Sequence, residues 1–547
     1  MATVPDIGFE PTIPVLLRQA VARFADRDLI VMDDRRATYA QIDGGSRRLA
    51  RRLMADGVGK GTRVAMHFAY SPEFLIAFLA VTRIGALAIP FSTAYAPGEL
   101  RRGLRRNDIH TFLVPPKMMG RNELAFIEGA LPALAGRSGP HFCAEMPHLR
   151  QVWVLGPSDR PWATAIDLAE ESSLVDDAML DEAEAEVAPG DWMVVISTSG
   201  STAEPKGVVH THGTVIRKTA GAGLGYGVVP EPHAIFAAMP LFWIGGLISL
   251  TGALANGTTM VCQERFEATD ALDLIERERC VAVTAWISIT QALREHPSLD
   301  QRDLSSIPML TAPVSSRPYG TVLGMTESCG PHLTQPHPVY GMDLPEHLRG
   351  SLGIAAPHFD HKIVDPDDGS TVIEGDGEGE LCIRGYATLA TLYKLERHQV
   401  FDDDGYYHTG DRVRREEGLY FFTGRVTEMI KAHGANVAPP EVEAVLESLP
   451  EVKFAFVVGI PDAERGEQVA AVVVPSGEGP LDVSILRDKT RAELSAFKVP
   501  RTVVCMAEEE VPWLATGKPD KRAMKSVLTE AAANLRETEP PLGSFGR

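Results

Sequence analysis

A run of hydroxyl, glycine and lysine side chains at residues 197–207 is the stretch of this sequence best suited to chemistry. It follows the apolar residues 192–196, which are typical of a buried strand. Backbone N–H groups, hydroxyls and the ammonium group of Lys206 are the donors that bind polyphosphate. The spacing differs from that of a P-loop, and Pro205 comes directly before Lys206. The run predicts a phosphate-binding loop, with a surface loop rich in turn-forming residues as the alternative.

Two carboxylates stand in short turns further along the chain. In residues 324–328 the hydroxyl of Thr326 precedes the carboxylate of Glu327, a pair that could hold Mg²⁺ and a phosphate oxygen. Asp411 follows the tripeptide His-Thr-Gly, where its carboxylate could accept both hydroxyls of a ribose. The alternatives are a solvated turn for Glu327 and an Asx turn for Asp411.

Two cations follow these carboxylates in the sequence. Arg425 comes soon after Asp411, and it could contact ribose or phosphate, or form a surface ion pair. Lys518 stands between Gly517 and Pro519 in a short loop, so it could reach into a cleft, although most lysines are simply exposed.

Alternating helices and strands must position these motifs. Apolar residues at helical spacing alternate with short apolar runs, which predicts layered α/β structure with a parallel sheet. The expected helices are 13–24, 39–53 and 72–84, and the expected strands are 29–32, 64–68, 86–90, 192–196, 235–239, 259–262 and 281–284. Residues 167–186 are acidic and predict a solvated helix and connector.

From residue 377 the sequence pattern changes to one typical of short strands and turns, which predicts a small β subdomain. A compact α+β region follows Gly424. Its expected helices are 440–448 and 483–495, and its expected strands are 452–458 and 468–474.

Composition limits the class of protein. A chain of 547 residues exceeds one ordinary core, so at least two domains are expected. The net charge of −20 disfavours nucleic acid as the main partner. The six cysteines are scattered without a Cys-x-x-Cys pair, which argues against a disulfide framework or a zinc site. No membrane span or secretory signal is apparent, and a cytoplasmic location is expected.

The order and spacing of the motifs resemble the adenylate-forming (AMP-binding) superfamily of acyl-CoA synthetases, luciferases and peptide-synthetase adenylation domains. The resemblance runs from Thr38-Tyr39 through residues 83–86 to Gly517-Lys518, and is strongest to the acyl-CoA synthetase and fatty-acid–CoA ligase branch. It implies an α/β fold. A large N-terminal domain of layered α/β subdomains with a small β-barrel-like subdomain (residues 1–425) precedes a hinge (426–428) and a smaller mobile α+β domain (429–547).

The resemblance also implies roles for individual residues. The loop that cradles the ATP phosphates corresponds to Thr198, Ser199, Gly200, Ser201, Thr202 and Lys206. Thr326 and Glu327 correspond to the phosphate and Mg²⁺ pair, with Thr198 also near the metal, and Asp411 with Arg425 corresponds to the ribose site. Lys518 corresponds to the adenylation lysine and Thr427 to the hinge pivot. Lys431 and the backbone of Gly434 match the loop that lines the thioester-forming site.

The implied reaction joins a carboxylate to the α-phosphate of ATP, releases pyrophosphate, and then transfers the acyl group from AMP to the thiol of coenzyme A. Rotation of the small domain would exchange Lys518 for Lys431 and Gly434 between the two steps. The acceptor could instead be a carrier protein acting in trans. A luciferase-like oxygenase and a catalytically inactive binding protein are further alternatives. The expected partners are the acid and coenzyme A, with a monomer or homodimer as the assembly.

The chain departs from the family pattern at three places. Relatives usually have Gly where this loop has Ala203. The segment of residues 310–319 is shorter than in most relatives, and Leu323 stands where most relatives have an aromatic residue. We therefore predict no adenine-stacking residue. In residues 239–246, Trp243 stands where many coenzyme A ligases have His, and no Asp is present for a substrate ammonium. Trp243 with Gly245 and Gly246 therefore predicts a pocket for an apolar acid, with ordinary core packing as the alternative.

Overall fold

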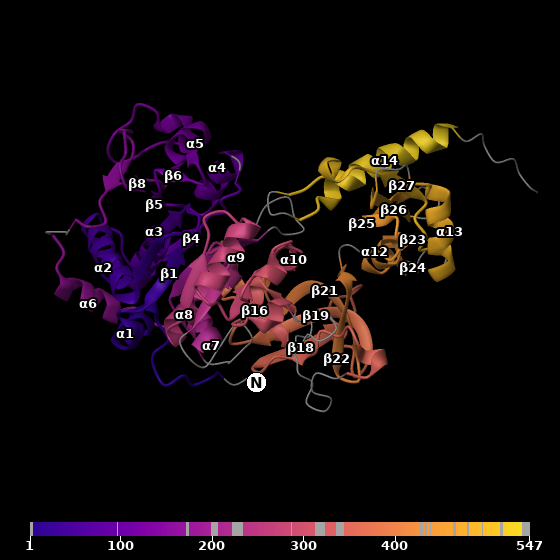
Figure 1. The fold of residues 1–547 in the computed structure, drawn as a ribbon, viewed down its shortest axis with the longest axis horizontal. Coiled ribbons are helices and arrows are strands. Elements are labelled where there is room, and N and C mark those ends of the chain that lie inside the picture. The colour runs from indigo at the N-terminus through magenta and orange to yellow at the C-terminus, as the bar shows by residue number, and fades with distance from the viewer. Residues whose placement is uncertain are drawn as a thin grey trace, which may run out of the picture. The chain divides into compact units, whose positions relative to one another are not determined.

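The computed structural model describes most of the chain as two compact units. The described residues are 4–95, 97–170, 174–198, 206–220, 233–285, 287–311, 323–334, 344–426, 430–432, 435–437, 439–462, 466–477, 481–494, 496–514 and 518–538. The first unit comprises Met1–Pro345, Gly353–Asp360 and Ile383–Tyr407 (Figure 1). The second comprises Glu346–Leu352, His361–Cys382 and His408–Arg547. The second unit thus includes residues 346–352, 361–382 and 408–425, which precede the predicted hinge. The predicted domain division and its hinge stay predictions.

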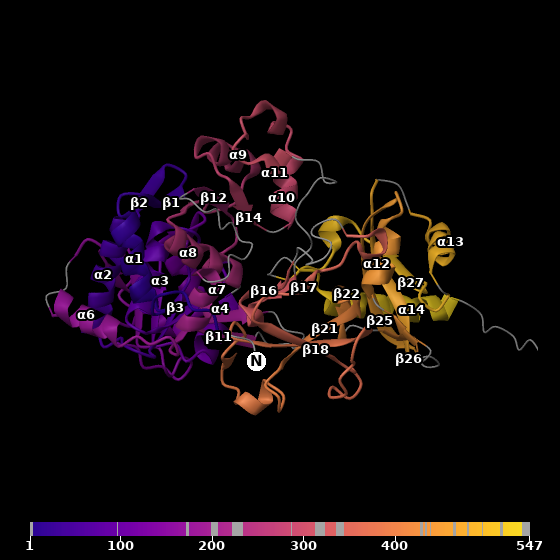
Figure 2. The ribbon, with the colours of Figure 1, turned by 90° about the horizontal axis from the view of Figure 1, so that it is seen from below.

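The first unit contains a five-stranded sheet in the order β14–β12–β13–β1–β2. All pairs are parallel except β1–β2. Its apolar side chains pack against α9 (Ala268–Arg277) and α10 (Ile287–Arg294), which lie side by side (Figure 2). The strands are β1 (Asp28–Met32), β2 (Arg35–Thr38), β12 (Ala234–Ala237), β13 (Thr259–Cys262) and β14 (Ala282–Thr284).

A second sheet of the same unit has eight strands in the order β20–β11–β10–β4–β3–β5–β8–β9. The strands from β10 to β9 pair in parallel, whereas β10–β11 and β11–β20 are antiparallel. The strands are β3 (Arg63–Met66), β4 (Leu87–Pro90), β5 (Thr111–Val114), β8 (Gln151–Leu155), β9 (Thr164–Ile166), β10 (Trp192–Thr198), β11 (Lys206–Thr211) and β20 (Thr391–Leu392). β6 (Lys117–Met118) and β7 (Arg121–Asn122) form a separate short hairpin.

Local sequence explains where the helices begin. α2 starts at a capping box in which Thr38 and Gln41 satisfy each other's backbone N–H groups, and α3 starts where Ser71 accepts from the N–H of Phe74 ahead of Pro72. Nearly every side chain of α3 is buried, as expected for a helix enclosed by the core. The helices of this unit are α1 (Ile13–Phe24), α2 (Tyr39–Ala55), α3 (Pro72–Arg83), α4 (Pro97–Arg106), α5 (Glu123–Ala130), α6 (Asp177–Ala185), α7 (His212–Ala220), α8 (Ile244–Asn256), α9 (Ala268–Arg277), α10 (Ile287–Arg294) and α11 (Pro308–Thr311).

A small three-stranded sheet completes the first unit. It has the order β15–β16–β17, with β15 (Leu323–Met325), β16 (Gly330–Thr334) and β17 (Ile354–Ala355). The ammonium group of Lys218 on α7 is buried and donates to the carbonyl of Pro331 at 2.6 Å. This contact attaches β16 to the helical layer, and burial lowers the pKa of Lys218 to about 8.

The second unit carries most of a four-stranded sheet and a separate α+β region. The sheet has the order β18–β19–β21–β22, with β18 (Phe359–Val364), β19 (Gly377–Gly385), β21 (Tyr407–Glu416) and β22 (Leu419–Arg425). The α+β region packs α12, α13 and α14 on a sheet whose long hairpin buries side chains on both faces. Its elements are β23 (Ile430–Ala432), β24 (Ala435–Val437), α12 (Pro439–Glu447), β25 (Val452–Asp462), β26 (Gly466–Pro475), α13 (Val483–Glu493), β27 (Thr502–Cys505) and α14 (Lys521–Thr538).

The predicted fold class is confirmed, with two local differences. The predicted phosphate loop joins β10 to β11, and these two strands pair antiparallel in an otherwise mostly parallel sheet. In the acidic segment, most of α6 is exposed as predicted, but Glu184 is buried and accepts from Arg83 Nε at 2.7 Å. Within the described residues, no helix is long and apolar enough to cross a membrane, and the cytoplasmic location stays a prediction.

Candidate active site

The ends of the predicted phosphate loop are held together by strand pairing. Thr198 is the register partner of Lys206, and Ser197 is the partner of Gly207. The hydroxyl of Thr198 also donates to the carbonyl of Lys206 at 3.5 Å. The sheet thus fixes the entry and exit of the loop. The predicted residues Ser199, Gly200, Ser201 and Thr202, with Ala203, lie outside the described residues.

Close packing beneath the loop explains why residue 207 is a glycine. A Cβ there would lie 2.9 Å from Cγ1 of Val195 and 3.1 Å from Cβ of Tyr393. Its carbonyl accepts from the N–H of Tyr393 at 2.7 Å. A side chain at this position would push the exit of the loop away from the sheet.

The Thr326–Glu327 pair lies in a 3-10 turn, Thr326–Ser328, between β15 and β16. The two strands approach so closely that a Cβ on Gly324 would lie 2.7 Å from the carbonyl carbon of Gly330. The hydroxyl of Ser328 donates to the carbonyl of Gly330 at 2.6 Å and closes the turn. The predicted turn is therefore rigid, and it presents its carboxylate from a fixed backbone.

Two side chains that the sequence analysis did not assign hold this turn. Nε2 of His210 lies 2.7 Å from the carbonyl oxygen of Thr326, and the hydroxyl of Tyr407 donates to Oε1 of Glu327 at 3.3 Å. Because a carbonyl only accepts, Nε2 of His210 carries the proton. Burial lowers the pKa of His210 to about 4, so its ring is neutral at pH 7. Both residues lie on strands, His210 on β11 and Tyr407 at the start of β21, and nothing in their local sequence links them to this turn.

The donor set of this turn suits a hard divalent cation. Glu327 is only 8% exposed, and within the described residues it makes no ion pair. A carboxylate oxygen that is not neutralised by a protein cation is a ligand that Mg²⁺ prefers. Glu327 would hold the metal, and the hydroxyl of Thr198 is the second predicted ligand.

The structure pairs the two predicted ribose residues of the second unit. Asp411 and Arg425 are register partners on β21 and β22, and Nε of Arg425 lies 2.9 Å from Oδ1 of Asp411. Arg425 also donates to the carbonyl of Thr409 at 3.0 Å. The preceding Gly410 has φ +70°, a conformation that favours glycine. Asp411 is 3% exposed and already paired with a cation.

The remaining predicted residues of the second unit lie on its α+β region. Lys518 is exposed, and Trp513 and Pro519 are joined by a β-bridge. The carbonyl of Lys518 accepts from the N–H of Leu514 at 2.8 Å. Lys431 lies on β23, but its side chain is not among the described ones, and Gly434 and Thr427 lie outside the described residues.

The predicted acyl-pocket residues surround the start of α8. Trp243 is the half-buried N-cap residue, and its ring meets the ring of Phe242 edge-on at 5.3 Å. A Cβ on Gly245 would lie 2.5 Å from Cε of Met239, and one on Gly246 would lie 2.2 Å from the carbonyl oxygen of Pro240. Both glycines thus have a packing reason, and their role in a pocket stays a prediction.

Comparisons with known proteins identify related sequences and structures. The sequence model described as AMP-binding enzyme matches residues 17–393, and the one described as AMP-binding enzyme C-terminal domain matches residues 441–518. The indoleacetate–CoA ligase of Aromatoleum aromaticum is 30% identical, with 92% of this chain and 94% of that protein covered. The long-chain-fatty-acid–CoA ligase FadD13 of Mycobacterium tuberculosis is 29% identical, with 91% and 93% covered. The solved structure of the amide bond synthetase McbA from Marinactinospora thermotolerans superposes with a TM-score of 0.75 at 25% identity, covering 94% of this chain and 99% of that one.

Proposed function

Because this chain belongs to the AMP-binding enzyme family and is an adenylate-forming acyl-CoA ligase, we propose that it activates a hydrophobic carboxylic acid. The acid reacts with ATP to give an acyl-adenylate and pyrophosphate. The thiol of coenzyme A then displaces AMP to give the acyl-CoA. The assembly is proposed to be a monomer or homodimer.

The apolar residues at the start of α8 carry the proposal of a hydrophobic acid. Phe242 and Trp243 lie together there, and residues 239–246 contain no acidic side chain that could bind a substrate ammonium. The names of two relatives add support, since indoleacetate and long-chain fatty acids both join a carboxylate to an apolar body. An indole beside a phenyl ring gives the apolar surface that such a body needs.

The adenylation step needs stabilisation of negative charge on phosphate oxygens. We assign this task to the loop donors, including Thr198, Lys206 and the residues between them, with Thr326 beside Glu327. Mg²⁺ held by Glu327, when bound, neutralises charge on the phosphates. Asp411 and Arg425 bind the ribose, and Lys518 supplies an ammonium group to the adenylation step.

The thioester step has its own proposed residues. Lys431 and the backbone of Gly434 serve the reaction of the acyl-adenylate with coenzyme A. Lys518 serves only the first step, so the two half-reactions depend on different residues of the C-terminal region.

One assay tests the proposal. Pyrophosphate release is measured with a panel of acids, with and without coenzyme A, and the products are identified by mass spectrometry. We expect apolar acids to support turnover and to give acyl-CoA, while amino acids of similar size do not. Stalling at the acyl-adenylate would favour a carrier protein as the acceptor in trans. A preference for amino acids would contradict the proposed substrate class.

A further inference from the structure

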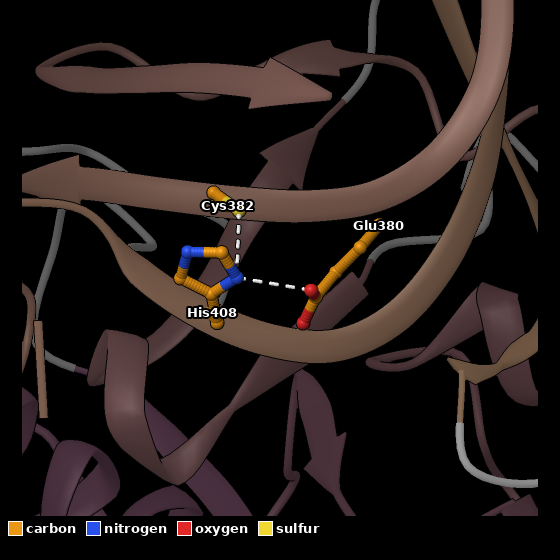
Figure 3. A group of neighbouring side chains, drawn as sticks. All are labelled: Glu380, Cys382 and His408. Carbon is orange, nitrogen blue, oxygen red and sulfur yellow. Dashed lines mark hydrogen bonds and ion pairs between the residues drawn. The ribbon is translucent and has the colours of Figure 1, made fainter. Parts of the chain in front are cut away.

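Glu380, Cys382 and His408 form a polar cluster in the second unit that the proposed reaction does not use (Figure 3). Glu380 and Cys382 lie two residues apart on β19, and His408 lies on the neighbouring strand β21. Nδ1 of His408 lies 2.9 Å from Oε2 of Glu380 and 3.5 Å from Sγ of Cys382. Cys382 is fully buried, Glu380 is 9% exposed, and His408 is half-buried.

The geometry of the cluster does not suit nucleophilic catalysis. A thiol is activated when one ring nitrogen of a histidine faces the sulphur and the other faces a carboxylate. Here the same nitrogen, Nδ1 of His408, faces both Cys382 and Glu380. Because a carboxylate only accepts, Nδ1 already carries a proton and donates it to Glu380. It is therefore not placed to take a proton from Cys382.

Hydrogen bonds account for the position of Glu380 without a metal ion. Its Oε2 accepts from His408, and its Oε1 accepts from the backbone N–H of Gly410 at 2.9 Å. A metal ion bound by Nδ1 of His408 would require that nitrogen to lose its proton and release Glu380. Both oxygens of the carboxylate are instead used to hold the segment that leads into Asp411.

The next residues extend this attachment. The hydroxyl of Thr409 donates to the carbonyl of Leu381 at 2.6 Å, and it accepts from the N–H of Asp411 at 3.0 Å. Three successive residues, from His408 to Gly410, are thus tied to Glu380 and Leu381 of β19. Gly410 leaves the extended conformation at φ +70°, and its N–H points to Glu380. The direction in which Asp411 leaves this turn depends on that contact.

We propose that Glu380 is a positioning residue for ribose recognition. It fixes Gly410 in its left-handed conformation, and through Gly410 it fixes the carboxylate of Asp411 that accepts the ribose hydroxyls. The inference rests on the proposed role of Asp411 in the reaction above. It predicts that replacing Glu380 specifically reduces the preference for ATP over an analogue that lacks the ribose hydroxyls.

The test compares ATP with 2′,3′-dideoxy-ATP as substrates of the full-length enzyme. For wild type, kcat/KM is expected to be higher with ATP, and the ratio of the two values measures recognition of the ribose hydroxyls. Glu380→Ala is expected to lower this ratio about tenfold, the size of one lost well-placed hydrogen bond to a charged group. Glu380→Gln keeps the shape of the side chain and an oxygen that can accept from the N–H of Gly410. It is therefore expected to retain most of the wild-type ratio. A merely structural loss would lower both values together.

Two further variants control for misfolding and for non-specific effects. Glu378→Ala changes the same residue type two positions earlier on β19, where the side chain binds Nε of Arg412 at 2.8 Å and Oγ1 of Thr423 at 3.1 Å. We expect it to leave the ratio unchanged. Gly410→Ala disturbs the φ of the turn directly, while the one described atom near its Cβ would be Nη1 of Arg425, at 3.6 Å. It is expected to lower the ratio as Glu380→Ala does.

The outcomes separate this inference from the proposed function. If Asp411→Asn leaves the ratio unchanged, Asp411 does not bind the ribose and the proposed site is wrong. If Asp411→Asn lowers the ratio while Glu380→Ala and Gly410→Ala do not, only the role of Glu380 is overturned. Stoichiometric zinc in the wild-type protein that is lost in Cys382→Ser would also overturn it, because Glu380 would then be a metal ligand.

Discussion

The turn that carries Glu327 in the first unit and the turn that carries Asp411 in the second present the same chemical group in opposite ways. Both carboxylates are buried, at 8% and 3% exposure. Among the described residues, uncharged side chains hydrogen-bond the Thr326–Ser328 turn. They are the neutral ring of His210, the hydroxyl of Tyr407 and the hydroxyl of Ser328 within the turn. The Asp411 turn is held by charged groups, Arg425 and Glu380.

The difference matches what each carboxylate is proposed to bind. A buried carboxylate without a paired cation gains most from a metal ion, because the ion supplies the missing positive charge. A carboxylate already paired with a guanidinium group gains less from a further cation, and its remaining lone pairs suit neutral hydroxyl donors. The contacts therefore favour Mg²⁺ at Glu327 and ribose at Asp411.

The largest expected effect comes from removing the charge of Glu327, which no cation among the described residues pairs. Glu327→Gln keeps an oxygen that can accept from Tyr407, but it loses the charge that is proposed to hold Mg²⁺. We expect the rate of adenylation to fall about a hundredfold, the scale of one lost electrostatic contact to the transition state. The measurement is pyrophosphate release in the absence of coenzyme A across a range of Mg²⁺ concentrations.

Tyr407→Phe is the matched control for this variant. It removes the hydroxyl that donates to Oε1 of Glu327 and keeps the charge and the ring. We expect a fall of less than about tenfold, because one neutral hydrogen bond is lost. Equal effects of the two variants would show that the hydrogen bond, and not the charge, accounts for the role of Glu327.

An intermediate effect is expected at the charged turn. Arg425→Lys keeps a positive charge near Asp411 but cannot also reproduce the second contact, from the guanidinium group to the carbonyl of Thr409. We expect KM for ATP to rise about tenfold, with a smaller change in kcat, because the lost contact orders a binding site and not the reacting atoms.

Arg412→Lys provides the comparison for Arg425→Lys. Arg412 is the neighbour of Asp411 on β21, and its Nε binds Glu378 at 2.8 Å. The same substitution there is expected to leave KM for ATP within about twofold, as is usual for a surface ion pair. A rise in KM at Arg412 as large as that at Arg425 would contradict a specific role for Arg425.

Apolar periodicity and turn residues predicted most elements to within a few residues, because both are local signals. Ile13–Phe24 and Thr259–Cys262 are examples with the predicted bounds. The antiparallel return of β11 and the roles of His210 and Glu380 were not predicted. His210 contacts the Thr326 carbonyl across more than a hundred residues, and such a contact leaves no trace in local spacing. The carboxylates were found because they stand in short motifs, whereas the side chains that hold them stand in ordinary strands.

The smallest expected change in activity is the few-fold effect of replacing His210, and the pH dependence of stability tests whether that histidine is neutral in the folded protein. Burial lowers the pKa of His210 to about 4, against 6.5 in the unfolded chain. Above pH 6.5 the ring is neutral in both states, so it adds no pH dependence. As the pH falls from 6.5 towards 4, the unfolded chain binds a proton that the folded protein does not, and the free energy of unfolding decreases. At pH 5 the decrease at this site is about 2 kcal/mol.

His210→Gln removes this titration while its amide N–H can still donate to the carbonyl of Thr326. The loss of unfolding free energy between pH 7 and pH 5, measured by urea denaturation, is expected to be about 2 kcal/mol smaller than in wild type. His212 is the matched control, because burial also lowers its pKa to about 4, yet its Nδ1 accepts from the N–H of Ile13 and not from the active-site turn. His212→Gln should reduce the pH dependence similarly and leave adenylation unchanged, whereas His210→Gln should also lower adenylation a few-fold, because the amide does not reproduce the ring's exact reach. An unchanged pH dependence in His210→Gln would mean that His210 gains its proton at the same pH in the folded protein and in the unfolded chain. The Glu327 turn would then be held by a charged ring at pH 5.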